Sequence, residues 1–176
     1  MSENKKLIYH GKIIDLYLEK VALPNGALAE LEIVHHPGGA AVVALDGNNL
    51  VCMLRQYRYA AGGWCWELPA GKLENTEPPL KTAQRELAEE AGVEAARWQS
   101  LGKIVSSPGV FTEIVHLFLA RDLTGVAARP EEHELIEIHW MPLAQALAWA
   151  HSGVITDAKT LAGLLRIQKL DGINVS

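Results

Sequence analysis

The stretch from Gly71 to Val93, GKLENTEPPLKTAQRELAEEAGV, decides how the rest of the chain is interpreted, because its periodicity is helical. Within 79–91 the apolar residues recur at the spacing of one helix face, on a stripe formed by Leu80, Ala83, Leu87 and Ala91. Two prolines fit only the first turn, and Gly92 fits the C-terminal cap, so both ends are marked. The sequence therefore predicts a helix over 79–91.

Three glutamates, called here the carboxylate cluster, crowd the end of this helix: Glu86, Glu89 and Glu90. Like charges one turn apart repel by roughly 0.2–0.5 kcal/mol per pair. At about 100° per residue, Glu86 and Glu90 project about 40° apart, and Glu89 lies within about 100° of Glu90. All three share one side of the helix, beside the apolar stripe. A hard divalent cation prefers such oxygen ligands, so the cluster indicates a metal site; a solvated acidic face is the alternative.

The spacing around the cluster is more specific than its charge. Five residues separate Gly71 from Glu77, seven more precede Arg85, and RELAEEAGV completes the pattern. Every position matches G-x5-E-x7-R-E-U-x-E-E-x-G-U, in which U is aliphatic. Seven fixed letters at fixed spacing arise by chance roughly once in a hundred million windows at average residue usage. The stretch resembles the Nudix box, and the chain is similar to Nudix hydrolases.

This resemblance implies a loop-helix-loop that binds Mg²⁺ or Mn²⁺ and supports hydrolysis of a nucleoside diphosphate linked to another group. Glu86 and Glu90 are the candidate metal ligands, and Glu89 is a candidate for a further ligand or for a base that positions water. For Arg85 the family pattern implies an orienting ion pair with Glu77. An ordinary i, i+4 pair between Arg85 and Glu89 is the alternative.

Other site residues follow from the resemblance rather than from the residues alone. The backbone carbonyl of Ala70, just before the box, is expected to be a metal ligand. In the family a glutamate from a late loop acts as the base, and the loop RPEEHELIE offers Glu132 as this base and Glu134 as a metal ligand. Their alternate spacing lets both point the same way if the loop is extended. Glu131 and Glu137 compete for the role of base.

Substrate preference depends on residues outside the box. RQYRY at 55–59, WELPAG at 66–71 and Pro108 resemble the ADP-ribose pyrophosphatase branch. Arg55 and Arg58 are candidates for binding the pyrophosphate or the distal ribose-phosphate as charge-assisted donors; charges at a sheet edge are the alternative. The resemblance implies hydrolysis of ADP-ribose to AMP and ribose 5-phosphate. The alternatives are a hydrolase of GDP-mannose or another nucleotide sugar, and a non-catalytic module that senses ADP-ribose.

Outside the helix, periodicity predicts an α+β fold. Residues 1–38 alternate as antiparallel strands around a turn at Pro24–Gly26. The runs Ala40–Leu45 and Leu50–Leu54 are typical of strands covered on both faces. Further strands are predicted within 98–109, 113–123 and 135–143, and further helices within 142–153 and 156–170.

The expected architecture is the Nudix fold over residues 39–176, a mixed β-sheet sandwiched between helices (α/β/α), preceded by a small antiparallel β unit over residues 1–38. The resemblance gives this N-terminal unit two roles, homodimerisation and the binding of adenine by aromatic side chains. Tyr17 is therefore a candidate substrate-binding residue. Trp64 and Trp66 are predicted to pack on the sheet, with stacking on adenine as the alternative.

Composition narrows the functional class. The 176 residues are 49% hydrophobic and 21% charged, with a formal net charge of −5. This charge argues against a non-specific binder of nucleic acid or membrane surfaces. No apolar run reaches the roughly 18 residues of a membrane helix, and no secretory signal is visible. Cys52 and Cys65 do not form a C-x-x-C pair, which suits a reducing cytosol. A cytoplasmic location and a nucleotide-sugar partner are therefore expected.

Overall fold

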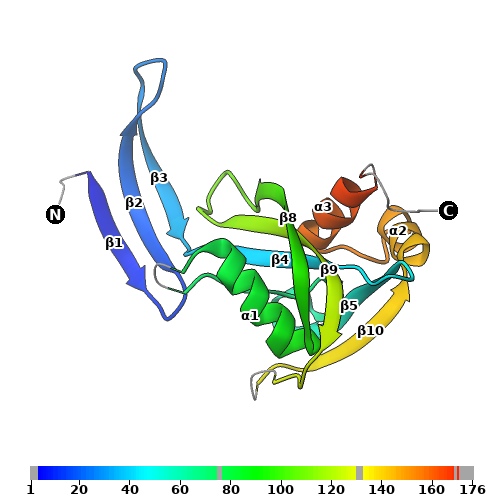
Figure 1. Cartoon of the computed structure of the whole chain (residues 1–176). Helices are drawn as coiled ribbons and strands as arrows, with labels where there is room; N and C mark the ends of the chain where they lie inside the picture. The colour runs from blue at the N-terminus through cyan, green and yellow to red at the C-terminus, as the bar shows by residue number, and fades with distance from the viewer. Residues whose placement is uncertain (1–3, 75–76, 130–132, 169, 171–176) are drawn as a thin grey trace.

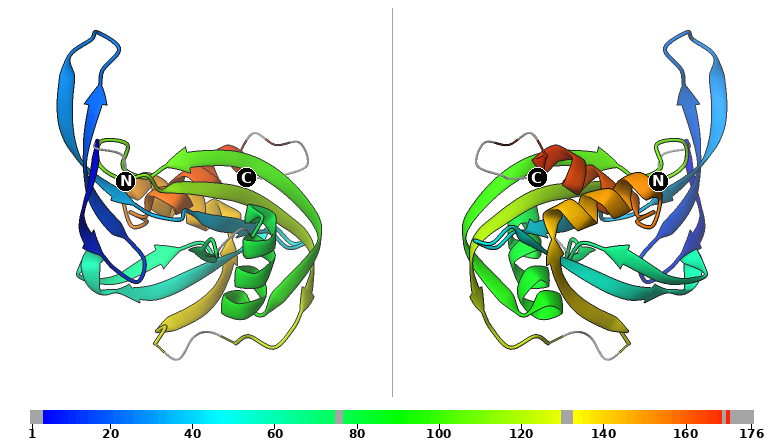
Figure 2. Two further views of the ribbon diagram at one scale, coloured as in Figure 1. Left: turned by 90° about the vertical axis from the view of Figure 1, so that its left-hand side faces the viewer. Right: turned by 90° about the vertical axis from the view of Figure 1, so that its right-hand side faces the viewer.

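The computed structural model describes residues 4–74, 77–129, 133–168 and 170, and these residues form three sheets and three α-helices (Figure 1). The N-terminal sheet is antiparallel, in the order β1 (Lys5–His10), β2 (Asp15–Ala22) and β3 (Leu28–His35). The β2–β3 turn contains Gly26 at a φ of 83°, as the turn signal predicts. This sheet lies to one side of the body of the molecule and extends beyond it (Figure 2). The predicted small antiparallel unit is therefore present.

The body contains two sheets, one mixed and one antiparallel. The mixed sheet has the order β7-β4-β9-β8, with β4 and β9 parallel, and the antiparallel sheet has the order β10-β5-β6. Their strands are β4 (Gly39–Ala44), β5 (Leu50–Arg58), β6 (Gly63–Glu67), β7 (Ala70–Lys72), β8 (Val93–Val105), β9 (Ile114–Gly125) and β10 (Ile136–Pro142). The mixed sheet is as predicted, but β5 and β10 belong to a second sheet that periodicity alone does not separate from it.

Helices cover both faces of the mixed sheet. They are α1 (Pro79–Ala91) and α3 (Ala158–Ile167), whereas α2 (Leu143–Ser152) packs against α3 and against β5 and β10 of the antiparallel sheet. Successive side chains of β4 point to opposite faces: Val42 packs in the cluster that contains Leu87 of α1, and Val43 packs in the cluster that contains Leu164 of α3. This confirms the α/β/α sandwich. Among the described residues, no helix is long and apolar enough to cross a membrane.

The predicted bounds of α1 agree with the structure because its stop signal is local. Gly92 has a φ of 65°, and its N–H donates to the carbonyls of Ala88 and Leu87, which completes a left-handed cap. The short strands β6 and β7, in contrast, carry no alternating pattern long enough to predict. They matter for the site, because β7 pairs with β4 and so places Ala70 opposite Ala41 and Gly71 opposite Ala40.

Candidate metal and active site

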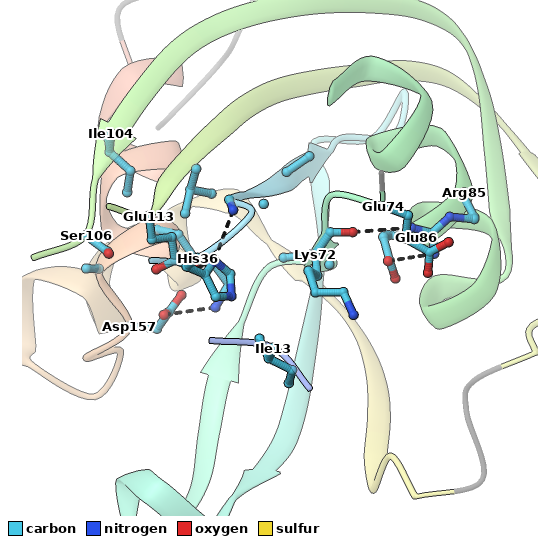
Figure 3. Close-up of a pocket in the computed structure, with 18 of the residues that line it drawn as sticks. Ile13, His36, Lys72, Glu74, Arg85, Glu86, Ile104, Ser106, Glu113 and Asp157 are labelled. Atoms are coloured by element: carbon cyan, nitrogen blue, oxygen red, sulfur yellow. Dashed lines mark hydrogen bonds and ion pairs between the residues drawn. The ribbon is translucent and has the colours of Figure 1, made fainter. Parts of the chain in front are cut away.

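A cleft of about 420 Å³ opens where β4, β7, α1 and the beginning of α3 meet (Figure 3). Figure 3 shows its two ends, with Glu74, Arg85 and Glu86 at one and His36, Ser106, Glu113 and Asp157 at the other. Six of the predicted catalytic, substrate-binding and metal residues line the cleft: Arg58, Ala70, Arg85, Glu86, Glu89 and Glu134. The fold therefore brings the box, strand β5 and the late loop to one place.

Gly71 allows the carboxylate of Glu86 to lie directly against the backbone of β7. A Cβ added to Gly71 would lie 1.8 Å from Oε1 and 2.0 Å from Cδ of Glu86. The pairing of Gly71 with Ala40 of β4 fixes this backbone in the sheet. Only glycine therefore leaves room for Glu86 in its observed position.

Glu90 is a buried acid at the same place, with 2% of its surface exposed, and it accepts a hydrogen bond from the backbone N–H of Ala70 at 2.8 Å. Burial raises the pKa of Glu90 to about 8, assisted by the charges of Glu86 and Glu134 and opposed by the Ala70 N–H. Burial also raises the pKa of Glu86. The raised pKa values mean that the surroundings do little to stabilise the ionised carboxylates. A divalent cation would supply the missing positive charge.

Arg85 holds two members of the carboxylate cluster together. Its Nη1 donates to Oε1 of Glu86 at 2.8 Å and to Oε2 of Glu89 at 3.0 Å, and its Nη2 lies 3.6 Å from Oε2 of Glu77. Both pairings that the sequence leaves open, with Glu77 and with Glu89, are therefore present. Burial lowers the pKa of Arg85, but the neighbouring carboxylates raise it further, so the net shift is upward.

The carboxylate oxygens at this end of the cleft suit a hard divalent cation, although they do not surround a single point. Within the described part of the chain, no three His, Cys, Asp or Glu side chains already surround one point. Arg85 instead holds Glu86 and Glu89, and the Ala70 N–H holds Glu90. The oxygens, the glycine cradle at Gly71 and the raised pKa values fit a divalent metal ion.

The late loop reaches the same site. Glu134 lines the cleft, and its negative charge contributes to the raised pKa values of Glu86 and Glu90. Glu131 and Glu132, the latter the predicted base, lie outside the described residues. Glu137 lies on β10, where its Oε2 is 3.1 Å from Nη1 of Arg55 and outside the cleft.

The two candidate arginines differ in position. Nε and Nη2 of Arg58 donate to the two carboxylate oxygens of Glu67, at 2.8 and 2.9 Å, and Arg58 lines the cleft. Arg55 pairs with Glu137, and its guanidinium carbon lies 4.8 Å from the centroid of the Trp64 ring. Both lie on β5, which is the central strand of its sheet. The alternative of charges at a sheet edge is therefore wrong for both.

The candidate aromatic residues lie outside this cleft. The ring of Tyr17 contacts His35, with 5.0 Å between the ring centroids, and the ammonium of Lys5 lies 4.0 Å from the Tyr17 centroid. Trp66 packs in the core against Trp149, as predicted. Trp64 instead lies on the surface of the sheet and is 44% exposed.

One end of the cleft could not be predicted from the sequence. His36 and Glu113, together with Asp157 and Lys159 at the beginning of α3, line it. The letters TDAK indicate a helix start, which is correct because Oδ2 of Asp157 accepts the backbone N–H of Thr160 at 3.0 Å. No periodicity or spacing links these residues to the box, since only the fold brings them beside it.

The profile of the NUDIX domain matches residues 35–164, which include the whole glycine, arginine and glutamate site. The chain belongs to the Nudix family. It is 41% identical to an ADP-ribose pyrophosphatase of Bacillus subtilis (strain 168), over 93% of this chain and 90% of that protein. It is 33% identical to a GDP-mannose pyrophosphatase of Cronobacter sakazakii, over 78% of this chain and 76% of that protein.

The fold of this Nudix protein also has a solved counterpart. A crystal structure of an ADP compounds hydrolase superposes with a TM-score of 0.81, and it covers 95% of this chain and 91% of that chain at 19% identity. This likeness extends over the N-terminal sheet as well as the body, because it covers nearly the whole chain. The predicted Nudix fold is therefore confirmed, and the protein is a Nudix pyrophosphohydrolase.

Proposed function

We propose that this protein hydrolyses the pyrophosphate bond of ADP-ribose, or of a closely related nucleoside diphosphate sugar, and releases AMP and ribose 5-phosphate from ADP-ribose. The observation that carries the proposal is the set of glutamates on α1 that lie against Ala70 and Gly71 at one end of the cleft. The 41% identity to an ADP-ribose pyrophosphatase supports this substrate. The similarity to a GDP-mannose pyrophosphatase makes GDP-mannose the second candidate.

We assign Mg²⁺ or Mn²⁺ to the carboxylate end of the cleft, held by Glu86, Glu90, the carbonyl of Ala70 and, from the late loop, Glu134. When bound, such an ion neutralises pyrophosphate charge and lowers the pKa of water. The side chains of the protein would orient the metal ligands, position the water and bind the substrate. Arg85 would orient the glutamates, as its bonds to Glu86 and Glu89 suggest.

Water must also be positioned and deprotonated for attack on phosphorus. Glu132 remains the proposed base, and Glu89 is proposed to position water or to serve as a further ligand. Glu89 is suited to this role because its side chain is 42% exposed and lines the cleft. Arg58, which lines the same cleft, is proposed to bind a phosphate or the distal ribose-phosphate of the substrate. Arg55 and Tyr17, which do not line the cleft, are proposed to contact parts of the substrate that extend beyond it.

A panel of nucleotide sugars tests the proposed reaction directly. With Mg²⁺ present, we expect the highest kcat/KM for ADP-ribose, with AMP and ribose 5-phosphate as products. Mass spectrometry of products formed in ¹⁸O-labelled water will show which phosphorus is attacked. Preferred turnover of GDP-mannose would reassign the substrate, and tight binding without turnover of any sugar would instead favour a sensing module.

We propose that the N-terminal unit, residues 1–38, forms a homodimer. Its sheet extends away from the body and exposes large apolar side chains, among them Leu7, Ile8, Tyr9 and Leu28. Leu28 is 86% exposed, and contact with a second copy of the sheet would remove its apolar surface from water.

Leu28→Glu is expected to convert the dimer to a monomer, because a charge would be buried in the interface. Leu165→Glu is the control, since Leu165 is also exposed, at 66%, but lies on α3. Light scattering coupled to gel filtration measures the mass of each variant. A dimeric Leu28→Glu protein, or a monomeric wild type, would contradict the proposed interface.

We propose the cytoplasm as the location of the protein. Cys52 and Cys65 are both free thiols, and Cys52 is buried. Burial raises the pKa of the Cys52 thiol to about 12, so it stays protonated and unreactive. Free cysteines of this kind are typical of a reducing compartment.

A further inference from the structure

The first turn of α3 contacts the short segment 67–70, which leads into the carboxylate end of the cleft. Glu67 ends β6 and is 3% exposed, and its two oxygens accept hydrogen bonds from Arg58 at 2.8 and 2.9 Å. Nζ of Lys159, the second residue of α3, donates to Oε2 of Glu67 at 2.5 Å. The side chain of Lys159 thus crosses from α3 to the end of β6.

The next residue of the segment is also held by α3. The backbone N–H of Leu68 donates to Oγ1 of Thr160 at 2.9 Å, and Thr160 is fully buried. The Thr160 hydroxyl in turn donates to Oδ2 of Asp157 at 2.6 Å, and Lys159 donates to Oδ1 of the same carboxylate at 3.0 Å. Asp157 therefore fixes both side chains that reach the segment.

Ala70 lies two residues beyond this anchor, and its surroundings are equally constrained. The carbonyl of Pro69 accepts the N–H of Val42 at 2.9 Å, and the N–H of Ala70 donates to Glu90 at 2.8 Å. Helix α3 lies so close that a Cβ on Gly163 would be 2.7 Å from Cδ1 of Leu68. The segment cannot shift toward α3, and its position depends on the contacts that α3 makes.

The charged side chains of this network could either attract an anion or fix the geometry of the segment, and their charges balance. Arg58 and Lys159 carry two positive charges, and Glu67 and Asp157 carry two negative charges. Burial raises the pKa of Glu67, but Arg58 and Lys159 lower it further, so the carboxylate is ionised and paired. Because Lys159 is paired with the carboxylates of both Glu67 and Asp157, its charge serves to fix geometry rather than to attract an anion.

We propose that Lys159 and Thr160 are positioning residues that fix the backbone carbonyl of Ala70, and thereby set the affinity of the site for its divalent cation. The inference rests on the proposed function, in which this carbonyl is a metal ligand. Residues that orient a metal ligand from outside change metal affinity by about 10–100-fold when they are replaced. Neither residue needs to touch the substrate or the ion.

Thr160→Val tests the backbone anchor without changing any charge. Valine keeps the shape of threonine but removes the acceptor for the Leu68 N–H, whereas Thr160→Ser keeps it. Binding of Mn²⁺ to the substrate-free protein is measured from the electron paramagnetic resonance signal of free Mn²⁺. We expect the Kd to rise about tenfold or more for the valine variant and to stay near the wild-type value for the serine variant. A partly unfolded sample lowers the number of sites in the titration, so the Kd still reports the folded fraction.

Lys159→Met separates positioning from simple electrostatics, because the two predict opposite signs. Loss of a positive charge near the site would tighten cation binding, whereas loss of the anchor weakens it. We expect weaker Mn²⁺ binding by about tenfold. Lys81→Met, which removes the charge of an exposed lysine on α1, is the control and is expected to bind Mn²⁺ at least as tightly as the wild type.

Three results would overturn the inference. Wild-type affinity in both Thr160→Val and Lys159→Met would show that α3 does not position the site. Tighter Mn²⁺ binding by Lys159→Met would show that its charge alone matters. A wild type that neither binds Mn²⁺ nor hydrolyses any nucleotide sugar would reject the proposed function itself. This failure is distinguishable, because it is seen in the wild type alone, before any variant is compared with it.

Discussion

Glu90→Gln is expected to lower kcat by at least about 100-fold. Replacing a residue that only supports a metal ligand costs up to about 100-fold, and Glu90 is itself a proposed ligand. Glutamine keeps an oxygen that can accept the Ala70 N–H, so the local hydrogen bond survives. It removes the negative charge that a cation requires. Activity should therefore fall while the fold stays intact.

The same substitution should raise the stability of the metal-free protein at high pH. The pKa of Glu90 is about 8 in the folded state, against 4.5 for an ordinary glutamate. Between these values the folded protein binds more protons than the unfolded chain, so its stability falls as pH rises. The contribution is fully present below pH 4.5 and is lost as pH rises through 8, with an upper limit of about 5 kcal/mol.

Thermal unfolding without metal, followed at pH 5 and pH 8, measures this effect. We expect Glu90→Gln to melt several degrees above the wild type at pH 8 and much closer to it at pH 5. Glu94→Gln is the control, because Glu94 is exposed at the beginning of β8, and it should change neither activity nor the pH dependence. If Glu90→Gln unfolds or melts lower at pH 8, the carboxylate cluster has a structural role.

Gly71→Ala is expected to remove most activity and leave the protein folded. The new Cβ would occupy the place of the Glu86 carboxylate, with 1.8 Å to its Oε1. The φ of Gly71 is not in the left-handed region, so alanine causes no backbone strain there. Because the obstructing atoms are the end of a flexible side chain, Glu86 would rotate away from β7 and the sheet would remain. We expect a loss in kcat of at least about 100-fold.

Gly47→Ala provides the matched control for this prediction. Gly47 lies in the turn between β4 and β5, its φ is also outside the left-handed region, and a Cβ there would meet no heavy atom within 4 Å. Its activity and melting temperature should be those of the wild type. Initial rates and circular dichroism of both variants check the pair. Full activity in Gly71→Ala would mean that Glu86 does not need its place against β7.

Local signals in the sequence were sufficient for α1. Its apolar stripe, its prolines and Gly92 all lie within residues 78–92, so they predict both ends and the face on which the cluster lies. The strands β6 and β7 could not be predicted, because three to five residues are too few to display a period. The division of strands between two sheets is likewise a property of long-range pairing.

The same contrast between local signals and long-range contacts applies to the candidate site. The positions of Glu86, Glu89 and Glu90 relative to one another follow from helix geometry, whereas the cradle for Glu86 at Gly71 depends on the pairing of β7 with β4 and could not be predicted. Residues of α3 could not be found, since Thr160 meets Leu68 across 92 positions of sequence. Only the packing of α3 on the mixed sheet brings them together. The role of Glu132 stays a prediction.

The separation of 92 residues between Leu68 and Thr160 also has a consequence for biosynthesis. When the ribosome has just released the box, the helix that anchors segment 67–70 has not yet been translated. The nascent chain can therefore form α1 early, because its signals are local, but it must wait for α3 before the Ala70 carbonyl is held in place. A half-made chain should accordingly display the glutamates of the site without its affinity for metal.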